Sequence, residues 1–182
     1  NLQAGFGGLQ GRALVTGDVL RCDSVAVEPA RTPDAFRLPM SSSWALRACA
    51  ASETDLLDDD SLDHLFNTNW TVARRADRMG VRLEGPGLVV SSDGRMPSAG
   101  VIPGTIQCPE DGSPYVLSVD AGTVGGYPRI AQVARVDRHA LGQLRPGDHV
   151  RLLRREPDDA VVELRAKLAY WREWLPDIND IL

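Results

Sequence analysis

Three segments concentrate the residue types that could do chemistry, and the first of them is rich in arginine. Residues 74–86 read Arg-Arg-Ala-Asp-Arg-Met-Gly-Val-Arg-Leu-Glu-Gly-Pro, with four arginines and two carboxylates in a turn-rich stretch. The planar guanidinium fork matches the oxygens of a carboxylate or a phosphate, so this segment could bind an anionic ligand. Ion pairs within the protein, from arginine to aspartate or glutamate, would explain the same residues equally well.

The other two segments carry glycines where the backbone could approach a ligand closely. Residues 98–109 read Ser-Ala-Gly-Val-Ile-Pro-Gly-Thr-Ile-Gln-Cys-Pro, with two glycines near the polar Ser98 and Gln107. Residues 120–128 read Asp-Ala-Gly-Thr-Val-Gly-Gly-Tyr-Pro. A double glycine that follows a strong strand can present backbone N–H groups to an anion or an oxyanion. A plain hairpin turn followed by Tyr-Pro is the alternative interpretation of this third segment.

Signatures of nucleophilic and metal catalysis are missing from the sequence. It contains no Gly-x-Ser-x-Gly, no His-Glu-x-x-His and no phosphate-binding loop with its lysine, since Lys167 is the only lysine. Cys108 could act as a thiol nucleophile, but a buried cysteine is the favoured interpretation because no base is paired with it. We expect no metal site, and the acidic run 58–60 is most simply a solvated helix junction.

The composition is that of an ordinary globular protein. The chain has 182 residues, 43% of them hydrophobic and 25% charged, which suits one domain with a real core. The net charge of -5 argues against nucleic acid as a partner. No apolar run is long enough to span a bilayer, so we expect no membrane contact. Three cysteines without a CxxC motif favour a reducing compartment, and we expect the cytoplasm.

The elements that must position these segments are short strands. Turn signals recur every 8–12 residues or so, which favours a mainly β protein, a barrel or a sandwich. Strands are predicted at 44–51, 69–73, 88–90, 115–119, 130–136 and 150–153, with short helices capped by Ser61 and by Asp137. A turn of the form Leu-x-x-Gly-Asp occurs twice, at 14–18 and 144–148. These copies are either equivalent corners of one β-structure, each flanked by strands, or a coincidence of turn chemistry.

A C-terminal amphipathic helix follows the strands. Asp158 is a good N-cap, and apolar residues recur at spacings of three and four from Val161 to Leu175 before Pro176 ends the helix. Glu163 and Lys167 are spaced as a favourable i,i+4 pair. The helix either packs on the strands or offers its tryptophans to a partner subunit. We therefore divide the chain into a β domain, residues 1–156, and a helix with its tail, residues 157–182.

Taken together, the three segments resemble a known family, the biotin-dependent carboxyltransferase-like proteins that include the C subunit of 5-oxoprolinase, KipA and allophanate hydrolase subunit 2. The family's Asp-Arg-Met-Gly-x-Arg-Leu-x-Gly run is similar to 77–85, and its Ser-x-Gly-x-x-Pro-Gly-x-Ile-Gln run to 98–107. Its Thr-Gly-Gly-Tyr-Pro motif resembles 120–130, and its Gln-Leu-x-Pro-Gly-Asp turn resembles 143–148. The resemblance covers about residues 7–153 and indicates the C-terminal part of a longer subunit.

The resemblance implies a cyclophilin-like β-barrel that works with a KipI-like partner, similar to the B subunit of 5-oxoprolinase. The implied activity is ATP-dependent hydrolysis of an amide, most simply of 5-oxoproline to glutamate, with ATP bound with or by the partner. On this basis Gln107, Gly125 and Gly126 are expected to contact the polarised oxygen. The residues expected to bind the rest of the substrate are Arg78, Arg82, Ser98 and Tyr127.

Two departures from the family pattern keep other functions open. The family's Gln-Thr-Thr is Gly-Thr-Val at 122–124, and a Gly-Pro-Gln is replaced by Ala-Ser-Glu at 51–53. One alternative is an allophanate hydrolase or a urea carboxylase carboxyltransferase, which would use biotin. Another is a non-catalytic, KipA-like regulatory module that binds a KipI-like kinase inhibitor. The loss of the glutamine and one threonine slightly favours the regulatory module.

Overall fold

The structure is a computed structural model that describes residues 4–22, 31–37, 39–91 and 96–176. The chain divides into two compact units, Asn1–Arg37 and Leu38–Leu182. The elements, in chain order, are η1 (Asp34–Phe36), β1 (Ser43–Ala50), η2 (Thr54–Leu56), α1 (Asp59–Asn67), β2 (Asn69–Ala76), β3 (Gly80–Glu84), β4 (Ala99–Gly100), β5 (Thr105–Gln107), β6 (Tyr115–Leu117), β7 (Val124–Gly125), β8 (Arg129–Val133), η3 (Arg135–Gln143), β9 (His149–Arg154) and α2 (Pro157–Arg172).

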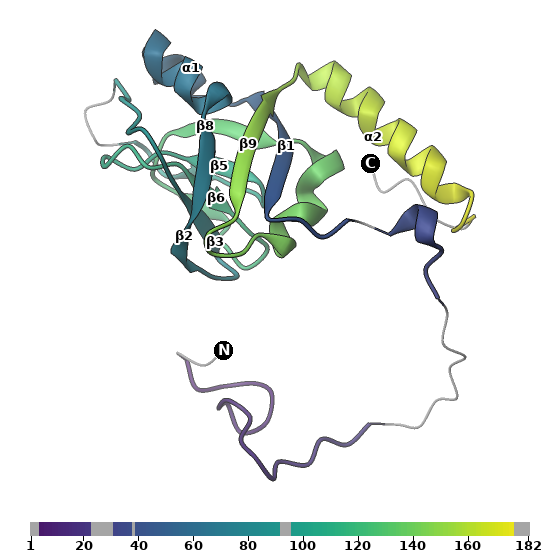
Figure 1. Cartoon of the computed structure of the whole chain (residues 1–182). Helices are drawn as coiled ribbons and strands as arrows, with labels where there is room; N and C mark the ends of the chain where they lie inside the picture. The colour runs from purple at the N-terminus through teal and green to yellow at the C-terminus, as the bar shows by residue number, and fades with distance from the viewer. Residues whose placement is uncertain (1–3, 23–30, 38, 92–95, 177–182) are drawn as a thin grey trace. The chain divides into compact units, whose positions relative to one another are not determined.

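The second unit is built around a closed barrel of seven strands, in the order β1-β8-β5-β6-β3-β2-β9 (Figure 1). All neighbours run antiparallel except β1 and β9, whose parallel pairing from Ser43↔His149 to Ala48↔Arg154 closes the ring. Closure removes the unpaired sheet edges that an open sheet would leave. The predicted mainly β fold with short helices is therefore confirmed, and of the two predicted architectures the structure is the barrel and not the sandwich.

Alternating side chains explain why these strands form and where they face. In β9, for example, Val150 and Leu152 are fully buried while His149 and Arg151 are exposed. The interior is filled by apolar residues from every strand of the barrel, with Trp70 of β2 the largest of the fully buried ones. One predicted strand is wrong, because the stretch 88–90 makes only a single bridge, between Val90 and Leu57. It lacks a second pairing that would extend a ladder.

The two Leu-x-x-Gly-Asp copies share a turn but not a structural setting. Gly17 and Gly147 both adopt positive φ, 98° and 88°. In each turn the aspartate side chain accepts a backbone N–H three residues earlier, at 2.8 Å from Val15 and at 3.0 Å from Arg145. Only the second copy leads into a strand, since residues 13–20 contain none. The predicted strands around the first copy are therefore wrong, and the repeat is one of local turn chemistry.

The helix starts differ from those predicted. Asp58, not Ser61, caps α1, because its side chain accepts the N–H of Ser61 at 2.8 Å. The Ser61 hydroxyl accepts the backbone N–H of Val89 instead, also at 2.8 Å. The 3-10 helix η3 starts after Ala134 and has no side-chain cap, while Asp137 is buried within it and binds Arg47. Both aspartate and serine are good caps, so the sequence does not choose between them.

The C-terminal helix α2 lies along the outside of the barrel beside β1 (Figure 1). Glu156 occupies its N-cap position, with Pro157 in the first turn, so the predicted cap at Asp158 is wrong. Leu164 is buried against Ala134 and Val136. The helix therefore packs on the barrel unit, chiefly against η3, which agrees with the first of the two interpretations.

The predicted pairing between the charges of α2 is also wrong. Glu163 binds Arg47 and Arg155, whose guanidinium nitrogens each lie 3.1 Å from its carboxylate oxygens. The amine of Lys167 donates instead to the Val136 carbonyl at 2.8 Å. Both side chains are thus held by partners outside the helix, and these tertiary contacts replace the i,i+4 pair.

Within the described part of the chain, none of the helices is both long and apolar enough to cross a membrane.

Candidate functional site

The two glycine-rich segments, residues 98–109 and 120–128, meet outside the barrel wall. A two-stranded ribbon forms from β4 and β7, with Ala99 opposite Gly125 and Gly100 opposite Val124. The ribbon lies against Gln107 at the end of β5, because a Cβ added to Gly125 would stand 2.5 Å from Gln107 Nε2. Only glycine permits this approach while the Gln107 amide keeps its position, which explains the residue at position 125. The structure thus brings two residues with predicted catalytic roles into contact.

Three further predicted residues lie at the same place. The Gln107 amide is buried and donates from Nε2 to the Tyr127 carbonyl at 3.3 Å. The Tyr127 side chain is exposed. A Cβ on Gly126 would lie 3.7 Å from Ser98 Oγ. We call Ser98, Gln107, Gly125, Gly126 and Tyr127 the amide–glycine cluster.

The two predicted anion-binding arginines are engaged elsewhere. Arg78 forms an ion pair with Asp120, with Nε 2.9 Å from Oδ2, and its side chain is 79% exposed. Arg82 donates from Nη2 to Asp111 at 2.7 Å and to Ser113 at 2.9 Å. These partners all lie outside the amide–glycine cluster. The interpretation as internal pairs, left open by the sequence, therefore describes their contacts.

A half-buried ion pair beside the cluster is not predicted from the sequence. Glu53, in the turn after β1, accepts from Arg129 at the start of β8 through three hydrogen bonds: from the backbone N at 2.9 Å, from Nε at 2.7 Å and from Nη2. The side chains are only 12% and 25% exposed. The two residues are 76 positions apart, so no local pattern could pair them. The sequence offers a separate signal for each residue: Arg129 follows the Gly-Gly-Tyr-Pro motif directly, and Glu53 lies in the segment 51–53 that departs from the family pattern.

The Glu53–Arg129 pair gives a pH-dependent contribution to stability. Hydrogen bonds from the Arg129 guanidinium lower the pKa of Glu53 below its ordinary 4.5. A lowered folded-state pKa means that the contribution is complete above the unfolded-state pKa and is lost as the pH falls through the folded-state value. We expect Glu53→Gln to lower the free energy of unfolding by about 2 kcal/mol at pH 7 and by less at pH 3, measured by urea titration. The exposed Glu110→Gln is the control, and an equal loss at both pH values would contradict the expectation.

Cys108 is unsuited to nucleophilic catalysis. It lies at the end of β5 with 1% exposure, and burial, helped by the nearby Asp111, raises the pKa of its thiol to about 11. The thiolate, not the thiol, is the nucleophile, so little reactive species exists near neutral pH. The predicted buried cysteine is confirmed.

Two of the three cysteines, Cys22 and Cys108, are therefore expected to alkylate at very different rates. Cys22 is exposed and Cys108 is buried, so iodoacetamide at pH 8 should label Cys22 within minutes and leave Cys108 unmodified in the folded protein. At that pH only roughly a thousandth of the Cys108 thiol is ionised. Peptide mass spectrometry before and after unfolding in urea measures the difference. Rapid labelling of Cys108 in the folded chain would show that the site opens.

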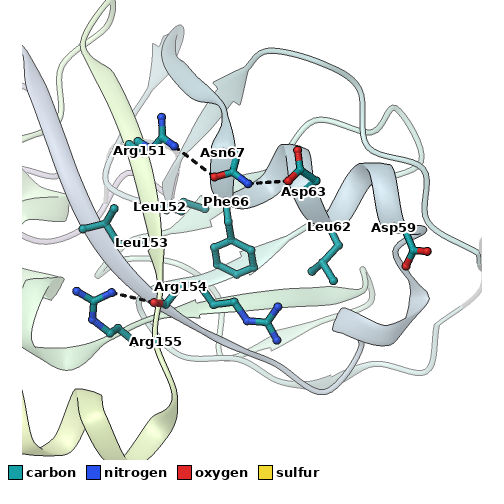
Figure 2. Close-up of a pocket in the computed structure, with 10 residues that line it drawn as sticks. All are labelled: Asp59, Leu62, Asp63, Phe66, Asn67, Arg151, Leu152, Leu153, Arg154 and Arg155. Atoms are coloured by element: carbon teal, nitrogen blue, oxygen red, sulfur yellow. Dashed lines mark hydrogen bonds between the residues drawn. The ribbon is translucent and has the colours of Figure 1, made fainter.

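A groove of about 440 Å³ lies away from the cluster, between α1 and β9 (Figure 2). Several of its polar residues bind one another. Arg151 donates to Asn67 at 3.3 Å, Asn67 donates to Asp63 at 2.7 Å, and the Arg154 guanidinium lies 5.8 Å from the centre of the Phe66 ring. No residue of the amide–glycine cluster lines it. We therefore take the cluster, and not this groove, as the candidate site.

The described residues contain no group of three histidine, cysteine, aspartate or glutamate side chains placed to hold a metal ion. The chemistry available at the cluster is donation of N–H groups: one side-chain amide, adjacent glycine backbone and, at its edge, a guanidinium. Such an array stabilises negative charge that develops on an oxygen.

Comparison with known proteins identifies relatives of this arrangement. The C subunit of 5-oxoprolinase from Escherichia coli strain K12 is 31% identical over 173 residues, which cover 95% of this chain and 55% of that protein. The C subunit of 5-oxoprolinase from Haemophilus influenzae is 33% identical over 151 residues, covering 83% and 48%. The chain thus spans about half the length of the curated relatives it matches.

The fold has a relative among solved structures, and a family model matches most of the sequence. The urea carboxylase of Kluyveromyces lactis superposes with a TM-score of 0.72 at 24% identity, covering 86% of this chain and 16% of that one, which shows a shared fold. The model of the carboxyltransferase domain, subdomain A and B, matches residues 1–154, a range that contains the barrel and the whole amide–glycine cluster. The chain therefore belongs to the carboxyltransferase domain, subdomain A and B, family.

Proposed function

We propose that this chain is part of a subunit of an ATP-dependent amide hydrolase that opens 5-oxoproline to glutamate. The proposal is supported by the two relatives named as C subunits of 5-oxoprolinase, at 31% and 33% identity. The observation that carries it is the contact of Gln107 with the Gly125 ribbon, which gathers N–H donors at one place. In the reaction, water adds to the lactam carbonyl carbon, the C–N bond breaks and the nitrogen takes up a proton.

The role of the cluster is to stabilise the carbonyl oxygen as it becomes negative. One hydrogen of Gln107 Nε2 is held by the Tyr127 carbonyl, which fixes the amide plane and leaves the second hydrogen to donate. Donors that are already oriented need no reorganisation during the reaction, which is the main source of their catalytic effect. The backbone N–H of Gly126 is proposed as the second donor, because Gly126 follows β7 and has no side chain to cover it, whereas Gly125 is paired with Ala99 in the ribbon.

ATP and the remaining machinery are proposed to come from a KipI-like partner in the cytoplasm, similar to the B subunit of 5-oxoprolinase. Lys167, the one lysine of the chain, is held by the Val136 carbonyl of η3, and burial lowers the pKa of its amine. It is thus not positioned as a phosphate-binding cation at the cluster. ATP would supply the free energy for opening a stable lactam.

The test is a reconstitution with the partner. The chain, co-expressed and co-purified with a protein similar to the B subunit of 5-oxoprolinase, is incubated with ATP and 5-oxoproline, and glutamate is measured. We expect glutamate only when chain, partner and ATP are all present. A stable complex that releases no glutamate would contradict the proposal and favour the KipA-like regulatory module.

A carboxyltransferase of the urea carboxylase type is the second candidate function, and the shared fold with the Kluyveromyces lactis enzyme favours it. This activity would need carboxybiotin, so the same complex is assayed with urea and free carboxybiotin in place of 5-oxoproline. Carboxylation of urea without glutamate release from 5-oxoproline would select it.

A further inference from the structure

We propose that Arg129, with its guanidinium plane fixed by Glu53, binds the carboxylate of the substrate at the amide–glycine cluster. The inference rests on the proposed function for the identity of that substrate. The inference assigns to Arg129 the carboxylate-binding role that the sequence analysis expects of Arg78 or Arg82.

The position of Arg129 follows from the sheet. Arg129 pairs with Gln107 across β5 and β8, and it is joined through Pro128 to Tyr127, whose carbonyl holds the Gln107 amide. Its Nη1 reaches the Gly100 carbonyl of β4 at 3.4 Å. Gly100 is adjacent in sequence to Ala99, the ribbon partner of Gly125. The guanidinium therefore spans from the barrel wall to the ribbon that carries the double glycine.

Glu53 occupies one edge of the guanidinium and leaves another edge available. The carboxylate of Glu53 takes the Nε and Nη2 edge in a bidentate pair. The edge formed by Nη1 and the second hydrogen of Nη2 makes one long bond, to Gly100. The side chain of Arg129 is 25% exposed, twice the exposure of Glu53, so solvent reaches the arginine more than its partner. A ligand that approaches this edge competes only with the long bond to the Gly100 carbonyl.

The chemistry of that edge selects a carboxylate. Two parallel N–H groups match the two oxygens of a carboxylate, and a fork whose rotamers are already fixed loses less conformational entropy on binding. The Glu53 charge largely offsets that of Arg129, which favours a singly charged carboxylate over a phosphate. In 5-oxoproline one short ring joins the carboxylate to the lactam carbonyl, so both ends can reach neighbouring donors.

The test compares two ligands that differ in the carboxylate alone. 5-Oxoproline and its neutral analogue 2-pyrrolidinone are titrated into the ¹⁵N-labelled chain, and the Arg129 Nε–H and the Gly125 and Gly126 amide resonances are followed by NMR. We expect 5-oxoproline to shift all three and 2-pyrrolidinone to shift the glycine amides alone. Arg129→Gln should raise the Kd for 5-oxoproline at least tenfold and change the Kd for 2-pyrrolidinone by less than twofold.

The matched control is Arg155→Gln, which removes an arginine paired with a glutamate at 3.1 Å outside the cluster and should change neither affinity. Arg129→Lys keeps the charge without the fork, and it carries the test if Arg129→Gln does not fold, with an expected weakening of about fivefold. Unchanged 5-oxoproline affinity in a folded Arg129 variant would overturn the inference. An equal loss of 5-oxoproline affinity on replacement of Arg78 or Arg82 by glutamine would also overturn it.

Binding by the chain alone separates this inference from the proposed function. If the complex with partner and ATP fails to turn over 5-oxoproline while Arg129 still responds to it, the proposed reaction is wrong and the carboxylate site stands. If turnover occurs and Arg129→Gln leaves its KM unchanged, the reaction stands and the carboxylate site is wrong. A raised KM with little change in kcat supports both.

Discussion

Gly125→Ala is expected to lower the kcat of the assembled enzyme by about 100-fold and to leave the barrel folded. The added Cβ would stand 2.5 Å from Gln107 Nε2, so the Gln107 amide must turn away from the position in which it donates. Loss of one oriented donor to a developing oxyanion typically costs about two to three orders of magnitude in kcat. The displaced atom is the end of a flexible side chain, which can move without disturbing the strands.

The measurement is glutamate release by the reconstituted complex, together with a thermal unfolding curve for the chain. Gly142→Ala is the matched control, because a Cβ at that position meets no atom within 4 Å. Wild-type kcat in the Gly125 variant would show that the Gln107 amide takes no part in the reaction. Loss of the cooperative unfolding transition would show that the ribbon supports the barrel.

Trp70→Ala is expected to give the largest loss of stability, about 3–5 kcal/mol in the free energy of unfolding. The indole of Trp70 is fully buried in the barrel and donates from Nε1 to the Leu65 carbonyl at 3.1 Å. It also packs so closely on Gly85 that a Cβ there would meet the ring at 2.7 Å. Its removal leaves both a cavity and a buried carbonyl without its donor.

Urea unfolding followed by circular dichroism measures this loss. Trp171→Ala is the control, since that residue is half-buried on α2, where Leu164 is the only buried member of the helix. Its truncation should cost far less. A loss below about 1.5 kcal/mol for Trp70→Ala would mean that the barrel collapses into the space left by the indole.

Strands with strong alternation could be predicted from the sequence, and very short ones could not. The segments around Val116 and Ile130 were found because apolar and β-branched residues recur in them. Strands β4 and β7 have two residues each, too few to show any period. Their pairing accompanies the approach of Gly125 to Gln107, a tertiary contact that no local sequence pattern contains. The cap of α1 is not predictable for a related reason, since the Ser61 hydroxyl accepts the backbone N–H of the distant Val89.

The candidate site divides in the same way. Gln107 and the double glycine could be predicted because each lies in a dense local motif. Glu53 and Arg129 could not be paired, because their contact joins two ends of strands that the barrel brings together. Arg78 was a reasonable expectation from its motif, yet the motif is equally well explained by the ion pair that Arg78 makes with Asp120.

The closure of the barrel by β1 and β9 has a consequence for how the protein is made. Strand β1 ends at Ala50, but its two partners, β8 and β9, begin at Arg129 and His149. A ribosome therefore synthesises about 80 residues while both edges of β1 stay unpaired, and about 20 more before β9 can pair with the second edge. Contacts of such long sequence separation form slowly and expose strand edges in the meantime. Nascent chains stalled before β9 should accordingly engage chaperones, and chains released after it should fold free of them.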